Sequence, residues 1–150
     1  MKAREYFEQA QNAAQDMHSA SLRLAALRDS EQLQAVRYDK DGNNPNVSDA
    51  MKATDERIDY EAVFAERIEA AQAIIDDAFA FLYGNDGRHG LSRALGNRYA
   101  DVLCAHYLQL ETYVDLAHQM GCGDRYLRML ADEAMMYIDR VGFAKIRADS

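Results

Sequence analysis

Two cysteines and two histidines in the last third of the chain are the residues most suited to metal chemistry. They are Cys104, His106, His118 and Cys122. Two thiolates and two imidazoles are a common ligand set for a structural zinc ion. Residues two apart on a helix, however, point about 200° apart, so Cys104 and His106 are poorly placed to share one ion. We therefore expect core cysteines with reduced thiols, surface histidines, and no metal.

The acidic residues between Asp55 and Asp77 are the next candidates for chemistry. A di-iron helix bundle would need Glu-x-x-His motifs, which this stretch lacks. The chain also has no nucleophile elbow and no nucleotide-binding signature. The glycine-rich stretch at 84–90, GNDGRHG, has no Gly-Lys-Ser/Thr ending and follows no predicted strand, which favours a hinge or a helix C-cap. We expect a protein that is not an enzyme and binds no cofactor.

Arginines are the remaining candidates, because arginine is the residue that most often reads guanine in DNA. Arg125 and Arg128 lie near the start of the last helical stretch, and Arg93 and Arg98 belong to a locally basic stretch before it. The alternative is a solvated helix face on which Arg128 pairs with an acid four residues away. The candidate DNA-binding residues are Arg93, Arg98, Thr112, Arg125, Tyr126 and Arg128.

The overall charge does not favour nucleic acid. The chain has 150 residues and a net charge of −8, whereas nucleic-acid binders usually carry a basic surface. Residues 1–84 carry 9 Lys and Arg against 16 Asp and Glu, and residues 85–150 carry 8 against 9. The C-terminal part is therefore neutral enough to permit DNA binding without promoting it.

The elements that must position these residues are helices. The chain shows no period-two pattern of β-branched residues and contains one proline, so an all-α fold is predicted. Apolar residues in 3–37 and 49–83 recur at alternating spacings of four and three, as in the a and d positions of a coiled coil. These residues are Tyr6, Ala10, Ala13, Met17, Ala20, Leu24 and Leu27, then Phe64, Ile68, Ala71, Ile75, Ala78 and Leu82.

The stretch between the two tracts, residues 38–50, gathers Gly, Asn, Asp and the proline, which are turn-forming residues. It is long enough for the tracts to fold back as an antiparallel helical hairpin. Pairing of each tract with a second copy of the chain is the alternative. We predict two domains, a helical hairpin or coiled coil over 1–84 and a helix-turn-helix module over 85–150.

Three shorter helical stretches are predicted near the C-terminus, at 97–109, 112–120 and 124–141. The short turn between the last two contains two glycines, as a helix-turn-helix often requires. Thr112 is suited to cap the middle helix. The residues predicted to face inward are Leu103, Tyr107, Leu116, Ala117, Met120, Leu127, Leu130, Ala134 and Ile138.

Five short motifs in this region occur together in one register. They are His106-Tyr107, Thr112-Tyr113, Leu116-Ala117, Gly121-Cys122-Gly123 and Ala134-Met135. The run that contains them, residues 100–139, resembles region 4 of sigma-70 factors and, more narrowly, phage and prophage transcription regulators of the RinA/ArpU type. The chain departs from those regulators at Ala131, Asp132 and Glu133, where they tend to carry basic or polar residues.

The resemblance implies a cytoplasmic regulator of transcription with a C-terminal helix-turn-helix. Double-stranded DNA, RNA polymerase and a second copy bound through the heptad helices are the expected partners. The sequence has no run of 18 apolar residues and no signal peptide, so no membrane association is expected. The alternative function is a helical protein–protein interaction or phage assembly module that does not read DNA, which the acidic balance favours.

Overall fold

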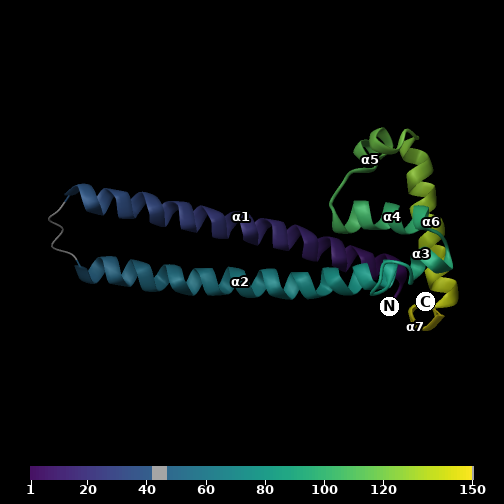
Figure 1. Cartoon of the computed structure of the whole chain (residues 1–150), viewed down its shortest axis with the longest axis horizontal. Coiled ribbons are helices and arrows are strands. Elements are labelled where there is room, and N and C mark those ends of the chain that lie inside the picture. The colour runs from purple at the N-terminus through teal and green to yellow at the C-terminus, as the bar shows by residue number, and fades with distance from the viewer. Residues whose placement is uncertain (42–46, 150) are drawn as a thin grey trace. The chain divides into compact units, whose positions relative to one another are not determined.

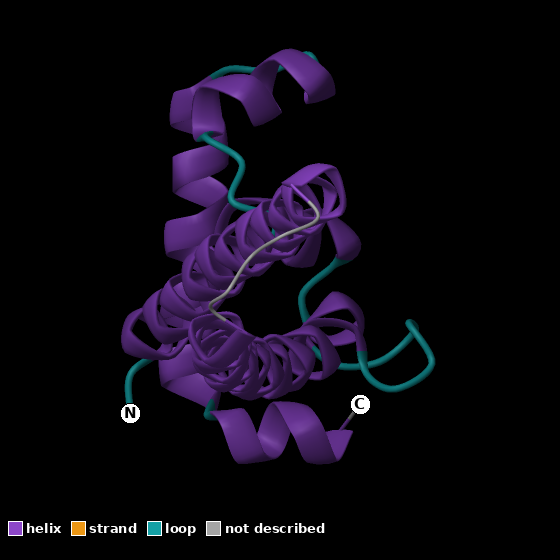
Figure 2. Cartoon of the chain, turned by 90° about the vertical axis from the view of Figure 1, so that its left-hand side faces the viewer, coloured by secondary structure: helices purple, strands orange, loops and turns teal. Residues whose placement is uncertain are grey.

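The computed structural model describes the backbone of residues 1–41 and 47–149 and the side-chain surroundings of residues 1–30 and 59–148. Every regular element in these ranges is a helix, so the all-α prediction is confirmed (Figures 1 and 2). In chain order the elements are α1 (Ala3–Asp41), α2 (Val47–Tyr83), α3 (Leu91–Ala94), α4 (Asn97–Leu103), the π-helix η1 (Cys104–Leu108), α5 (Tyr113–Met120), α6 (Asp124–Val141) and α7 (Phe143–Asp149). None of these described helices has an apolar stretch long enough to cross a membrane.

The helices group into two compact units. One contains Met1–Gln15 with Ala71–Ser150, and the other contains Asp16–Ala70. This division differs from the boundary predicted at residue 84. The first turns of α1 and the last turns of α2 contribute buried residues to the same core as the C-terminal helices, so they group with those helices.

In the unit Asp16–Ala70, α1 and α2 run in opposite directions (Figure 1). Arg67 on α2 binds both carboxylate oxygens of Asp16 on α1. Further along, Arg28 Nε lies 3.7 Å from Glu61 Oε1. The pairing partner on α2 thus moves to a lower residue number as the residue on α1 moves to a higher one. This order is expected for antiparallel helices. The predicted apolar positions of this unit are buried or half-buried, namely Met17, Ala20, Leu24, Leu27, Phe64 and Ile68.

The first helix is longer than its apolar pattern. That pattern lies in a tract over 3–37 and fades after Leu27, which predicts a helix that ends before Arg37, whereas α1 continues to Asp41. No glycine or proline occurs in the chain before residue 42, and nothing else in the local sequence stops a helix. Helix length here follows from the position of the first breaking residues.

The unit Met1–Gln15 with Ala71–Ser150 has one continuous apolar core. Helix α6 packs against both α4 and α5, and α7 packs against α3 and α6. The ring centroid of Phe81, near the end of α2, lies 6.1 Å from that of Phe7 on α1 and 4.9 Å from that of Phe143 on α7. The large side chains that are fully buried are Phe7, Phe81, Leu82, Leu91, Val102, Leu103, Leu127, Ile138 and Ile146.

The glycine-rich loop 84–90 is a tight connection between α2 and α3. Gly84 follows α2 at φ 72°, the positive φ typical of a helix C-cap, as predicted. Asp86 Oδ1 accepts a hydrogen bond from Arg88 N at 3.0 Å and lies 2.6 Å from His89 Nδ1. The contact with His89 lowers the pKa of Asp86. Gly90 adopts φ 71°, and a Cβ atom there would lie 2.3 Å from the carbonyl oxygen of Phe81.

Candidate nucleic-acid interface

Helix α5 is bounded at both ends by residues suited to helix termini. Thr112 precedes it in an extended conformation, and its Oγ1 accepts a hydrogen bond from Asp115 N at 3.1 Å, so the predicted cap is confirmed. At the other end Gly121 has φ 68°, and Cys122 N donates to Ala117 O at 3.0 Å. This backbone pattern is a Schellman motif, and it reverses the chain directly before α6.

One side of α6 is buried against α4 and α5. The predicted inward-facing residues that are buried are Leu103, Tyr107, Leu116, Ala117, Leu127, Leu130, Ala134 and Ile138. For Met120 the prediction was wrong, because this last residue of α5 is 44% exposed and lines an open groove. The buried stripe leaves the opposite side of α6 facing solvent.

On one flank of α6, two hydrogen bonds join it to α4. Arg98 Nη1 donates to the Tyr126 hydroxyl at 2.7 Å, and its guanidinium lies 6.0 Å from the centroid of the Tyr126 ring. The Tyr99 hydroxyl donates to Glu133 Oε2 at 2.9 Å, and this bond raises the pKa of Tyr99. The structure thus brings together two predicted DNA-binding residues, Arg98 and Tyr126, and places Glu133 against α4.

On the other flank, Arg128 makes contacts within its own unit. Its Nε lies 3.8 Å from Asp124 Oδ2, and its guanidinium lies 5.1 Å from the centroid of the Tyr113 ring. This is the pairing four residues apart that the sequence offered as the alternative to DNA binding. Exposed helix pairs of this kind contribute only about 0.3–0.5 kcal/mol, so the pair does not prevent Arg128 from binding an external anion.

The two remaining acids of α6 contact the start of α1. Arg4 Nη2 lies 3.4 Å from Asp132 Oδ1, and Ala3 N donates to Asp139 Oδ1 at 2.8 Å. Every acid of α6 therefore has a partner from a neighbouring residue or element. Asp132 belongs to the stretch in which the chain departs from the RinA/ArpU-type regulators.

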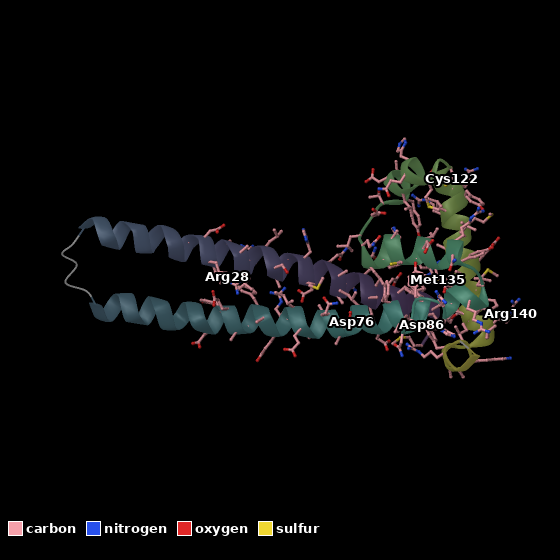
Figure 3. All side chains as sticks on the ribbon, viewed as in Figure 1. Arg28, Asp76, Asp86, Cys122, Met135 and Arg140 are labelled. Carbon is pink, nitrogen blue, oxygen red and sulfur yellow. The ribbon has the colours of Figure 1, made fainter. Side chains whose placement is uncertain are left out.

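Between these flanks, four exposed residues form what we call the outer strip, namely Arg125, Met129, Met136 and Arg140. On a helix of 3.6 residues per turn they fall within about 60° of one another. Met129 is 47% exposed and Met136 is 72% exposed. Figure 3 labels Arg140 near the end of α6. Its guanidinium lies 5.6 Å from the ring centroid of Tyr137. The four residues are therefore basic or apolar, and Asp132, which pairs with Arg4, lies beside them at about 20° from Arg125 around the helix.

The other two predicted DNA contacts lie on different elements. Arg93 is exposed on the short helix α3. The part of the chain that the structure describes shows no hydrogen bond or ion pair between Arg93 and α6. Thr112 is also exposed, and its hydroxyl oxygen already accepts the capping bond. The structure thus gathers four of the six predicted residues on or beside α6. Arg93 lies apart on α3, and Thr112 caps α5.

The cysteines and histidines considered as zinc ligands have other surroundings. Cys104 is buried, and burial raises the pKa of its thiol. His106 stacks on Tyr113 with ring centroids 3.9 Å apart, and its Nδ1 lies 2.8 Å from the carbonyl oxygen of Glu111. Among the described residues, no three Cys, His, Asp or Glu side chains are grouped as a metal site.

The sequence reasoning did not single out Met129 and Met136. A helical projection of residues 124–141 would have found them, because they recur at steps of four, seven and four with Arg125 and Arg140. The pairing of Asp132 and Glu133 had no such local signal, since their partners Arg4 and Tyr99 are distant in sequence.

Comparison with known proteins adds no assignment, since no protein-family model, no curated protein and no solved structure matches the chain.

Proposed function

We propose that α4 with η1, α5 and α6 form a helix-turn-helix, and that the protein is a DNA-binding regulator of transcription. The observation that carries this proposal is that each acid of α6 has a partner within the protein, whereas Arg125 is exposed and Arg140 contacts the ring of Tyr137. Arg125 and Arg140 both lie on the exposed outer strip. A helix with these features presents Arg125 and Arg140 to a major groove, with the exposed carboxylate of Asp132 already paired with Arg4.

The N-terminal residues of the second helix are the ones that reach base edges in this motif. Arg125 lies in the first turn of α6 with no hydrogen bond or ion pair within the described residues, so it has no intramolecular partner to give up there. Arg128 follows one turn later, with its guanidinium over the ring of Tyr113. We assign base contacts to Arg125 and a phosphate contact to Arg128.

Arg98 extends this surface onto α4. Its hydrogen bond to the Tyr126 hydroxyl holds a second cation beside the start of α6. Contacts to phosphates orient a protein on the duplex without reading its sequence. We therefore assign Arg98 to the phosphate backbone, next to the groove that α6 enters.

We further propose that α1 and α2 pair within one chain as an antiparallel coiled coil. The cross-helix ion pairs of Asp16 with Arg67 and of Arg28 with Glu61 support this pairing, as do the buried and half-buried positions along both helices. Such a hairpin would serve to contact RNA polymerase or a second copy of the chain.

Binding of the full chain to a fluorescent duplex of about 30 base pairs, at low salt and then at rising salt, tests the DNA-binding proposal. We expect binding at low salt that weakens as salt rises, because phosphate contacts release counterions. Arg128→Gln should reduce the salt slope by about 0.9, and Arg125→Gln should cost about 1–3 kcal/mol on a selected sequence. Arg23→Gln, at an exposed position of α1, is the matched control.

Absence of binding at low salt would exclude DNA recognition by this chain alone. A protein–protein interaction module is the second candidate, and the exposed Met129 and Met136 favour it, because exposed apolar side chains on one strip suit a protein partner. Under this alternative, Arg125→Gln and Arg128→Gln would change the affinity for the duplex no more than Arg23→Gln does.

A further inference from the structure

A groove separate from the outer strip lies beside α5. It has a volume of about 520 Å³ and is bounded by the end of α2, by α4 with η1, and by α5. All of these elements belong to one compact unit. Its apolar lining includes Phe79, Tyr83, Leu116 and Met120.

Two large apolar side chains of this groove are exposed to solvent. Phe79 is 48% exposed and Met120 is 44% exposed, whereas Leu116 is buried. The ring of Phe79 lies against that of Tyr83, with centroids 4.9 Å apart. Methionine adapts its shape readily to different partners. The groove therefore offers apolar area of the kind that a partner helix covers.

The charged groups that line the groove are acidic. Asp101 Oδ1 accepts a hydrogen bond from the Tyr83 hydroxyl at 2.5 Å, and Glu111 Oε1 accepts one from Gln119 Nε2 at 3.4 Å. Both donors are neutral. Among the described residues, no Lys, Arg or His lines the groove, so two carboxylates remain there without a cationic partner.

The backbone beside the groove is unusual. Cys104 and Ala105 belong to the π-helix η1, and Leu110, which follows it, is the one non-glycine residue with positive φ, at 60°, in the described part of the chain. Glu111 N donates to Ala105 O at 3.0 Å, which holds Glu111 over the groove. Short π-helices and left-handed non-glycine residues are found preferentially at functional sites.

From the apolar lining and the carboxylates that have no cationic partner, we infer that this groove binds an amphipathic helix of another protein. The apolar face of that helix covers Phe79 and Met120, and its Lys or Arg residues pair with Asp101 and Glu111. A second copy of this chain fits the groove less well, because each copy carries a net charge of −8 and like-charged copies repel each other. The inference does not depend on DNA binding, because no residue of the outer strip lines the groove.

The test uses the full chain with ¹³C-labelled methionine methyl groups and two synthetic helical peptides, one of Leu and Lys and one of Leu and Glu. The Leu/Lys peptide should shift the Met120 signal saturably at one peptide per chain. The signals of Met129 and Met136, on the outer strip, should not move. The Leu/Glu peptide should cause no shift.

Matched variants separate docking in the groove from general attraction to an acidic protein. Asp101→Asn and Glu111→Gln should each weaken binding of the Leu/Lys peptide about threefold, and Asp115→Asn, an exposed acid of α5 outside the groove, should not. Phe79→Ala should weaken binding about tenfold, whereas Ile74→Ala, at a residue that is 46% exposed on the same helix, should not. Thermal unfolding of each variant checks that the fold is kept.

Three results would overturn the proposal. The first is a peptide-induced shift at Met129 or Met136 in place of Met120. The second is an equal effect of Asp115→Asn and Asp101→Asn. The third is a Met120 signal that changes with protein concentration in the absence of peptide, which would show that a second copy occupies the groove. None of these results depends on whether the chain binds DNA.

Discussion

Arg125 and Arg128 are of one residue type and lie three positions apart, yet their surroundings differ. Arg128 contacts Asp124 and Tyr113, whereas Arg125 is exposed on the outer strip. Sequence alone placed both on the same helix, and it offered DNA contact and intrahelical pairing as equal alternatives. The structure shows the pairing for Arg128 only, which makes Arg125 the better candidate for reading bases.

Glycine is required at one position of the loop 84–90 and only tolerated at another. Gly90→Ala should destabilise the protein by about 3 kcal/mol or more, because its Cβ would lie 2.3 Å from the Phe81 carbonyl oxygen. Gly87→Ala should cost about 1 kcal/mol, since Gly87 also has positive φ but a Cβ there meets no atom within 4 Å. Chemical denaturation of both variants measures the difference, and equal losses would contradict this account of Gly90.

At the scale of elements, α6 has one buried side and one exposed side. Its buried side follows the predicted stripe of Leu127, Leu130, Ala134 and Ile138, because a helical period in the sequence is enough to locate it. A helical projection would also locate its outer strip, but only the structure shows the partners of Asp132 and Glu133. Those partners come from α1 and α4, and no local pattern predicts contacts over such separations.

Substitutions on the two sides of α6 should therefore have opposite consequences. Leu127→Ala should lower the free energy of unfolding by about 2–5 kcal/mol, because Leu127 is fully buried and a cavity would remain. Met136→Ala should change it by less than about 0.5 kcal/mol. Urea unfolding followed by circular dichroism gives both values. A large loss for Met136→Ala would mean that the outer strip is covered in the folded protein.

At the scale of the whole molecule, charge is distributed unevenly. The net charge of −8 arises mainly in residues 1–84, where α1 and α2 carry the cross-helix pair of Asp16 and Arg67. The predicted domain boundary at 84 followed the end of the second helical tract at the glycine-rich loop 84–90. The compact units instead follow packing, so that parts of both long helices belong with the C-terminal helices.

The pair of Asp16 and Arg67 should make stability depend on pH in acid. The hydrogen bonds from Arg67 lower the pKa of Asp16 below its ordinary value of 3.8. A carboxyl group with a lowered pKa in the folded state stabilises the protein above its ordinary pKa, and this contribution is lost as the pH falls through the lowered value. Asp16→Asn should therefore reduce the melting temperature by a few degrees at about pH 6 and by much less below about pH 3.

The matched control for this measurement is Asp29→Asn, at an exposed position of the same helix. Its melting temperature should follow that of the unsubstituted protein at every pH. A difference between Asp16→Asn and the unsubstituted protein that stays constant from pH 6 down to the acid limit would show that the ion pair is not its cause.

The sequence by itself determined the helical class, the capping of α5 by Thr112 and the buried stripe of α6. Each of these depends on residues within a few positions of one another, where helical periodicity and capping bonds act. Only the tertiary structure decided which groups the acids Asp132 and Glu133 of α6 contact, why Met120 is exposed, and where the acidic groove lies. These features depend on contacts between residues far apart in the chain, such as Arg4 with Asp132 and Tyr83 with Asp101, and local pattern carries no information on them.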